Sequence, residues 1–515
     1  MKRLRNKSLL FFLLLSTLSY SQTKYWIFLK DKNTADAAAI SSRTIQNRIQ
    51  QGLAPFDETD LPIQKDYYSL LTTHYQILNK SRWLNAVSAS LTSKEVSEVL
   101  SLPFVAKVQP IDGRFYVAKT THARRLVLAP VMTQIQSDAF KKAGLTAKGI
   151  TIGVIDAGFL EAPENDLLKH IFDRKAILDK RDYVNPSLTA TDKFYSTPET
   201  FSDFHGTEVM SAIAGINYSQ NKQHGLATDA QFYLARTDHG AREWRGEEDN
   251  WVAAMEWMDS LGVRLINTSL GYAQGFTDPN ENYQISEMDG KTSVISRAAQ
   301  IAADKKGILL VVSAGNEGDD PSWRIISTPA DAQGVLAIGA TNQRYWNRIG
   351  YSSIGPESLP YLKPNVSCFS LYGTSLTAPV ITGFAACLMQ ANPTLTNKEL
   401  INVIEKSAHL YPYGNNYIGY GVPLASRALA LLQNPAESSP SLYAREVQAT
   451  GDIFVLKLAD SSDMVSIFHK KNSTHVLIQE LIKVKDSQIT LKRREGETHT
   501  TVDLKNEVIE VIWER

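Results

Sequence analysis

Between residues 149 and 434, short runs of apolar residues alternate with longer stretches of helical periodicity. The apolar runs are continuous, as in strands that are covered on both faces of a sheet. This alternation predicts an α/β domain with a doubly wound, mainly parallel sheet flanked by helices. The expected strands are residues 150–155, 231–235, 264–268, 308–313 and 335–340, and the expected helices are residues 249–261, 292–305, 375–390 and 397–406.

A different pattern precedes this region. Residues 25–29 and 104–108 are apolar and strand-like, and residues 82–91 alternate in part. Thr92 and Glu95 have the spacing of a capping box, which predicts a short helix that ends before Pro103. We therefore expect a small α+β module within residues 22–120.

A third pattern follows the central region. Residues 434–440 (NPAESSP) have the composition of a linker. Beyond them, period-two runs at residues 454–458, 465–468, 476–478, 489–491 and 508–513 predict a small antiparallel β module over residues 442–515. The sequence leaves its role open between a secretion tag, a packing domain and a binding domain.

The first residues have the pattern of a secretory signal. Basic residues up to Lys7 precede an apolar run at residues 9–18, and small residues stand before Gln22. The run is too short to span a bilayer, which favours a cleaved signal peptide over residues 1–21 rather than an anchor. No later segment reaches about 18 consecutive apolar residues. We expect a secreted, periplasmic or extracellular protein without a membrane span.

Composition narrows the possible functions. Lys+Arg and Asp+Glu both number 54, which argues against a nucleic-acid partner. Two cysteines, Cys368 and Cys387, do not make a disulfide scaffold, and two buried thiols are favoured over a pair. Acidic clusters at residues 278–289 and 317–320 could bind structural calcium, although solvated loops are favoured. We expect a monomer that needs no metal or cofactor for its chemistry.

Three motifs carry candidate chemistry, in the order acid, base and nucleophile. Asp156 (GVIDAGF) directly follows an expected buried strand, His205 (FHGTEV) opens a helix, and Ser375 (GTSLTAP) begins another. A serine hydroxyl needs a base to take its proton and an acid to orient that base. The constellation predicts nucleophilic attack by the serine, with a peptide bond as the foremost target.

Asn316 adds a fourth element. The expected strand at residues 308–313 ends in SAGNEG, which places the Asn316 amide between two glycines. Such an amide can donate to a developing oxyanion. The Ser375 N–H, at the start of a helix, would be a second donor.

Together these motifs resemble those of subtilisin-like serine peptidases (subtilases). IDAGF, HGTEV, INTSLG, SAGNEG and GTSLTAP match the family's motifs in order, over a segment of residues 131–434. The resemblance implies that Asp156, His205 and Ser375 form the catalytic triad and that Asn316 binds the oxyanion. Ala157, Glu208 and Leu376-Thr377 depart from common family residues without removing a catalytic group, and the stretch of residues 363–375 is short.

The resemblance also implies where a substrate binds. Ser269, Leu270 and Gly271 would pair with the substrate backbone, and Ala314 and Gly315 would line the pocket beside it. The module at residues 22–120 is similar to the family's inhibitory propeptide, chiefly through residues 82–110. Its cleavage is expected between residues 112 and 131.

The leading hypothesis is a secreted serine endopeptidase that acts on polypeptides through an acyl-enzyme. It would be made as a self-processed zymogen with its own propeptide as an intramolecular inhibitor. The alternatives are a catalytically inactive binding protein with a peptidase fold and a hydrolase of small esters. Asp238 is expected to be structural rather than part of the cleft, whereas Tyr272 could be a structural residue or part of a substrate subsite.

Overall fold

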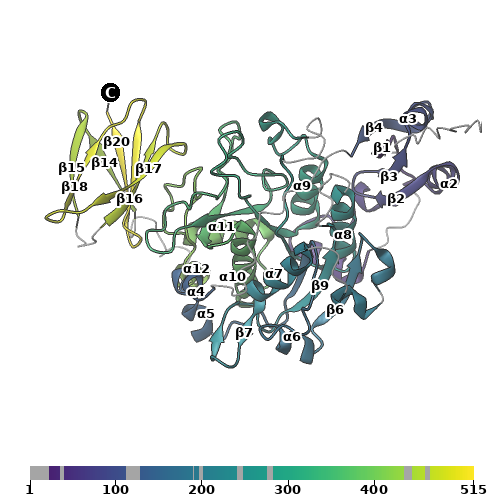
Figure 1. Ribbon diagram of the computed structural model, residues 1–515, viewed down its shortest axis with the longest axis horizontal. Helices are drawn as coiled ribbons and strands as arrows, with labels where there is room; N and C mark the ends of the chain where they lie inside the picture. The colour runs from purple at the N-terminus through teal and green to yellow at the C-terminus, as the bar shows by residue number, and fades with distance from the viewer. Residues whose placement is uncertain are drawn as a thin grey trace, which may run out of the picture.

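The computed structural model describes residues 23–34, 40–111, 128–189, 191–196, 201–239, 247–274, 282–433, 444–458 and 464–514. Within them three units follow in chain order. Figure 1 shows the first (purple) and the last (yellow) at opposite ends of the central one. The expected signal peptide, the linker and most of the expected propeptide junction lie outside the described residues.

The central unit is built on a sheet of seven strands in the order β13-β12-β11-β10-β5-β9-β6. Every strand pair in it is parallel, which confirms the predicted fold class. Two strands were not expected, because β6 is a largely polar edge strand and β13 has only four residues. The strands are β5 (Thr151–Asp156), β6 (Ile177–Asp182), β9 (Gln231–Arg236), β10 (Leu265–Thr268), β11 (Leu309–Ser313), β12 (Leu336–Thr341) and β13 (Val366–Phe369).

Helices cover both faces of this sheet. On one face lie α7 (His205–Ala214), α10 (Thr377–Ala391), α11 (Asn397–Ser407) and α12 (Ala425–Gln433), with the short helices α4 (Ala129–Gln134), α5 (Asp138–Lys142) and α6 (Lys169–Asp173). On the other face lie α8 (Glu248–Ser260) and α9 (Val294–Lys306). Alternate strand residues point to the two faces, so each face has its own apolar core.

One helical stretch of the described residues is long and apolar enough to cross a bilayer. It runs over Thr374–Ala391, and 89% of it is buried inside the structure. Its neighbours include α7, which packs against α10. Burial on all sides explains why α10 is apolar around its whole circumference.

The N-terminal unit is a four-stranded antiparallel sheet in the order β2-β3-β1-β4. Its strands are β1 (Thr23–Leu29), β2 (Gln76–Ser81), β3 (Ala86–Leu91) and β4 (Val105–Pro110), and its helices are α1 (Ser42–Gln50), α2 (Lys65–His74) and α3 (Ser93–Leu100). The Thr92–Glu95 capping box is present. The strand expected at residues 82–91 begins only at Ala86, after a turn, and α1, α2 and β2 were not predicted.

The C-terminal unit is the expected β module. It has a five-stranded sheet in the order β14-β20-β19-β16-β17 and a two-stranded sheet of β15 and β18. The prediction of a wholly antiparallel module was wrong, since β14 and β20 pair in parallel, the first strand lying beside the last. The strands are β14 (Ala444–Ala449), β15 (Ile453–Lys457), β16 (Met464–Lys470), β17 (Val476–Lys483), β18 (Gln488–Lys492), β19 (His499–Asp503) and β20 (Val508–Trp513).

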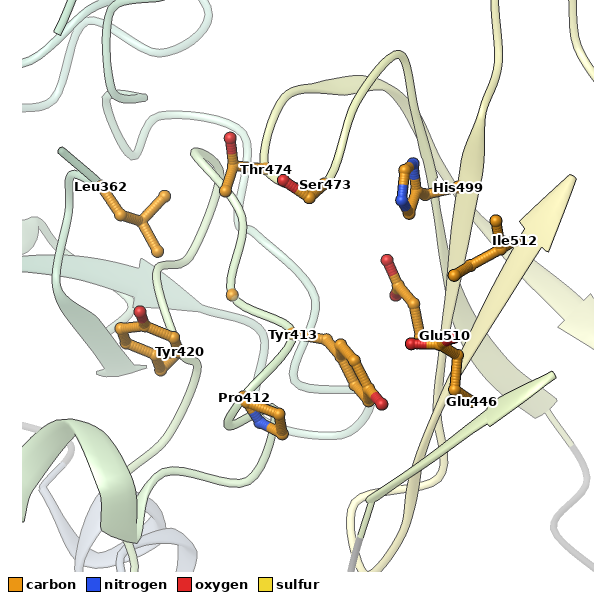
Figure 2. Close-up of a pocket in the computed structure, with 11 residues that line it drawn as sticks. Leu362, Pro412, Tyr413, Tyr420, Glu446, Ser473, Thr474, His499, Glu510 and Ile512 are labelled. Carbon is orange, nitrogen blue, oxygen red and sulfur yellow. The ribbon is translucent and has the colours of Figure 1, made fainter. Parts of the chain in front are cut away.

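This module packs directly on the central unit. The buried side chains of His409 and Asp503 meet across the junction, with 3.1 Å between Nε2 and Oδ2. A pocket of about 210 Å³ is lined by residues of both the central unit and the module. Figure 2 shows Tyr413 of the central unit opposite Glu446 and Glu510 of the module. His409 and Tyr413 both follow α11 in the chain.

Candidate active site

Asp156 and His205 meet where the end of β5 touches the start of α7. The Gly206 N–H donates to the Gly158 carbonyl at 2.8 Å. A Cβ on Gly206 would lie only 2.3 Å from that carbonyl oxygen, so this approach requires glycine. The contact brings His205 Nδ1 to 2.7 Å from Asp156 Oδ1, with both side chains buried.

The electrostatics of His205 are dominated by burial and by Asp156. Burial alone would lower the pKa of His205. The charge and hydrogen bond of Asp156 outweigh burial, with further contributions from Glu208 and Asp238, so the pKa lies above its usual value. Asp156 therefore stabilises the imidazolium form of His205.

Ser375 lies in a 3-10 turn (Thr374–Leu376) that leads directly into α10, so the α-helix begins two residues later than predicted. Its main-chain carbonyl accepts a hydrogen bond from the Ser269 hydroxyl at 2.9 Å. Among the described residues, neither Ser375 Oγ nor His205 Nε2, both buried, has a hydrogen-bond partner. Each keeps its donor or acceptor capacity unused.

Asn316 is oriented by Thr374. The Thr374 N–H and hydroxyl donate to Asn316 Oδ1 at 2.8 Å and 3.1 Å, so the amide nitrogen Nδ2 must point the other way. A Cβ on Gly373 would lie 3.4 Å from Asn316 Nδ2 and 3.3 Å from Ser375 Oγ. The amide donor and the serine oxygen thus face one point beside Gly373, whose φ of 139° favours glycine.

The predicted substrate-binding residues lie on both sides of this turn. Leu270 and Ala314 have buried side chains in the core, so only their backbone can contribute to binding. Gly271 and Gly315 are half-exposed, and Ser269 is held by its bond to Ser375. The segments Ser269–Gly271 and Ala314–Gly315 are therefore both tied to the turn that carries Ser375.

Tyr272 and Asp238 are not part of an open subsite in the described residues. Both side chains are fully buried, and the Tyr272 hydroxyl donates to Asp238 Oδ1 at 3.0 Å. Burial raises the pKa of Asp238 to about 7. Glu247, at the start of α8, also has a raised pKa from burial and from Asp238.

The turn that carries Asp156 is supported by Arg236, a residue with no clear sequence signal. Arg236, at the end of β9, donates to the Ala157 carbonyl at 3.0 Å and pairs with Asp182 and Asp203 at 3.3 Å and 3.2 Å. It therefore braces this turn. Asp156 Oδ2 is buried and has no partner among the described residues, beside the Ala157 that departs from the family pattern.

Cys368 and Cys387 are both free and buried, and burial raises the pKa of each thiol. No group of three or more His, Cys, Asp or Glu side chains within the described ranges is arranged to hold a metal ion. Part of the acidic cluster at residues 278–289 lies outside them. Glu317, in the other cluster, hydrogen-bonds to Ser353.

A parallel sheet with an Asp at a strand end, a His at a helix start and a Ser in the turn before another helix has the arrangement of a serine hydrolase. The match to known families narrows this class. The family described as "Subtilase family" matches residues 147–421, and the one described as "Peptidase S8 propeptide domain, Bacteroidota" matches residues 24–124. The chain belongs to the subtilase family of serine peptidases and carries a propeptide domain at its N-terminus.

Individual relatives agree with this assignment. The chain is 27% identical over 360 residues to subtilisin NAT of Bacillus subtilis subsp. natto, covering 67% of this chain and 81% of that protein. Subtilisin E of Bacillus subtilis (strain 168) gives the same identity and coverage. The fold is also similar to the crystal structure of an epidermin leader peptide processing serine protease from Staphylococcus aureus. That match has a TM-score of 0.52 at 16% identity and covers 81% of this chain and 99% of that one.

Proposed function

We propose that this subtilase is a secreted endopeptidase in which Ser375 attacks the scissile carbonyl. His205 takes the serine proton as general base and returns it to the leaving amine as general acid. Asp156 orients His205 and stabilises its charged form. Asn316 Nδ2 and the Ser375 N–H hold the oxyanion, and water then hydrolyses the acyl-enzyme.

The observation that carries this proposal is the 2.7 Å bond between His205 and Asp156 beside two unpartnered catalytic atoms. Treatment with a fluorophosphonate tests it directly. We expect the mature enzyme to become labelled at Ser375 and to lose its activity on an unfolded protein substrate. An enzyme that stays unlabelled and fully active would rule out this nucleophile.

Replacing Asn316 by alanine is expected to lower kcat by about 10²–10³-fold, the size of the effect in a subtilisin that loses its oxyanion amide. The KM should change little, because the amide acts on charge that develops in the transition state. Steady-state kinetics on one peptide substrate measure both. Asn342→Ala is a matched control, since Asn342 Oδ1 accepts backbone N–H bonds in a turn elsewhere. A kcat within about twofold of wild type for Asn316→Ala would contradict the role.

Replacing Glu208 by glutamine is expected to shift the pH profile. His205 must be neutral to accept the proton, so kcat/KM falls as the pH drops through its pKa. Glu208 contributes to raising that pKa. Removing its charge lowers the pKa of His205, and the acid limb of kcat/KM should move to lower pH. The exposed Glu495→Gln serves as control. An acid limb that stays in place or moves upward would refute the coupling.

The N-terminal unit is proposed to be an inhibitor that stays on the enzyme until it is cut. Its sheet lies against α8, on which three acidic residues meet partners from the propeptide. Lys24 Nζ is 2.5 Å from Asp249, the Ser81 hydroxyl donates to Glu256 at 2.5 Å, and Arg82 Nη2 donates to Asp259 at 2.9 Å. The propeptide therefore covers all three of these carboxylates.

A second contact involves α1. The Thr44 hydroxyl donates to the Asp259 carbonyl at 2.8 Å and Asn47 Nδ2 to the Gly262 carbonyl at 2.8 Å, so α1 satisfies carbonyls at the end of α8. Arg48, 1% exposed, joins Asp60 of the propeptide to Asp259 at 2.6 Å and 3.0 Å. These contacts support tight association of the propeptide with the catalytic unit.

Lys306 closes this ion cluster from α9. Its ammonium lies 2.8 Å from Asp60 and 3.1 Å from Asp57, so it joins the catalytic unit to the propeptide. Burial would raise the pKa of Asp60, but the bonds from Arg48 and Lys306 outweigh it and lower the pKa to about 2. The stability from Asp60 is present above its unfolded pKa and is lost as the pH falls toward 2. The contact should therefore survive at mildly acidic pH.

A further inference from the structure

Two glycines beside the catalytic turn face the same hydroxyl group. A Cβ on Gly271 would lie 2.1 Å from Ser327 Oγ, and a Cβ on Gly315 would lie 3.4 Å from it. Gly271 and Gly315 are half-exposed, whereas Ser327 is only 4% exposed. The Ser327 hydroxyl therefore lies beneath the space between the two glycine edges.

Both edges are tied to the turn that carries Ser375. Gly271 follows Ser269, whose hydroxyl bonds to the Ser375 carbonyl, and the Gly315 N–H donates to the Thr374 hydroxyl at 3.1 Å. The carbonyl carbon that Ser375 attacks bears the neighbouring Cα, from which the acyl-side residue extends its side chain. With the substrate backbone along the Gly271 edge, that side chain enters the space above Ser327.

The side of this space next to Gly315 is closed by a carboxylate. A Cβ on Gly315 would lie 2.7 Å from Glu317 Oε2 and 2.8 Å from the Ser353 hydroxyl. The carboxylate is held there by the Asn316 N–H at 2.8 Å and by Ser353 at 3.1 Å. Burial raises the pKa of Glu317. Three polar side chains, those of Ser327, Glu317 and Ser353, therefore border the space.

We propose that Ser327, together with Glu317 and Ser353, restricts the residue on the acyl side of the scissile bond to a short side chain such as that of alanine or serine. This rests on the proposed peptidase function. An aromatic ring would meet Ser327 Oγ and would press hydrocarbon against the Glu317 carboxylate, to which it can donate no hydrogen bond. A one- or two-atom side chain fits above the hydroxyl.

The test uses mature enzyme and matched peptides that differ only at the acyl-side residue. We expect kcat/KM for alanine to exceed that for phenylalanine by about tenfold or more, the range in which a small change of pocket size discriminates substrates. Ser327→Gly opens the floor and should shift the phenylalanine-to-alanine ratio upward by about tenfold or more. Ser322→Gly, an exposed serine five residues earlier, should leave the ratio unchanged.

The wild-type chain offers a second readout that needs no variant. The expected propeptide junction contains short residues as well as Phe115, Tyr116 and the pair Arg124-Arg125. The sequence of the mature N-terminus should show that cleavage followed a short residue, for which the choices are Gly113, Ala118, Ala123 and Ala129. Self-cleavage after an aromatic or an arginine would contradict the proposal.

The outcomes separate the two levels of inference. A protein that hydrolyses none of the peptides and does not react with a fluorophosphonate would defeat the peptidase function itself. A protein that reacts and hydrolyses peptides, but prefers phenylalanine or shows an unchanged ratio in Ser327→Gly, would overturn only the role of Ser327. Active-site titration with the fluorophosphonate corrects each kcat for the fraction of correctly folded enzyme.

Discussion

Replacing Ser375 by alanine is expected to lower kcat for peptide hydrolysis by about 10⁶-fold, as in a subtilisin that loses its triad serine. Without the hydroxyl no acyl-enzyme forms, and His205 has no proton to take. The same variant should remain joined to its propeptide, because self-cleavage needs the same nucleophile. Peptide hydrolysis and mass spectrometry of the purified chain measure the two effects.

The control for this variant is Ser322→Ala, at an exposed serine outside the site. It should be processed and should hydrolyse peptides like the wild type. Equal residual activity in wild type and Ser375→Ala would show that another group carries the chemistry. The absence of hydrolysis by both chains would instead favour the inactive binding protein with a peptidase fold.

Replacing Lys306 by methionine is expected to lower the free energy of unfolding of the zymogen by about 3–5 kcal/mol, the typical cost of breaking a buried ion pair. Lys306 is fully buried at its side chain and contacts two propeptide carboxylates, Asp57 and Asp60. Methionine fills similar space but leaves Asp60 with one cationic partner fewer. Urea titration measures the change, in a Ser375→Ala background that keeps the chain uncut.

Lys169→Met provides the comparison on the same chain. Lys169 pairs with Asp173 at 2.7 Å, but the two side chains are 65% and 61% exposed. Solvent screens such a pair, and its loss should change the free energy of unfolding by no more than about 0.5 kcal/mol. Equal effects of Lys306→Met and Lys169→Met would mean that the buried cluster does not hold the propeptide.

Much of the central fold could be predicted because its signals are local and periodic. Five of the seven sheet strands coincide with continuous apolar runs, and α8 to α11 begin and end within about two residues of the predicted limits. The parallel sheet follows from the alternation of strand and helix. The polar edge strand β6 and the four-residue β13 escaped prediction, since neither has a long apolar run.

The propeptide unit shows the opposite case. The Thr92–Glu95 capping box lies within three residues and was visible in the sequence. The helix α1 was not, because Arg48 is polar in sequence yet buried in the structure. Its burial depends on Asp259, more than two hundred residues away, and no local pattern records such a partner.

The motifs by themselves determined the family, the order Asp156, His205 and Ser375, and the expectation that these side chains sit at strand ends and helix starts. This was possible because each motif combines a reactive side chain with the glycine turn that exposes it. The tertiary structure decided what surrounds them. Thr374 turns the Asn316 amide, Arg236 braces the Asp156 turn, and Ser327 lies beneath two glycines from distant segments. Such relations depend on distances between segments far apart in the chain, which only folding defines.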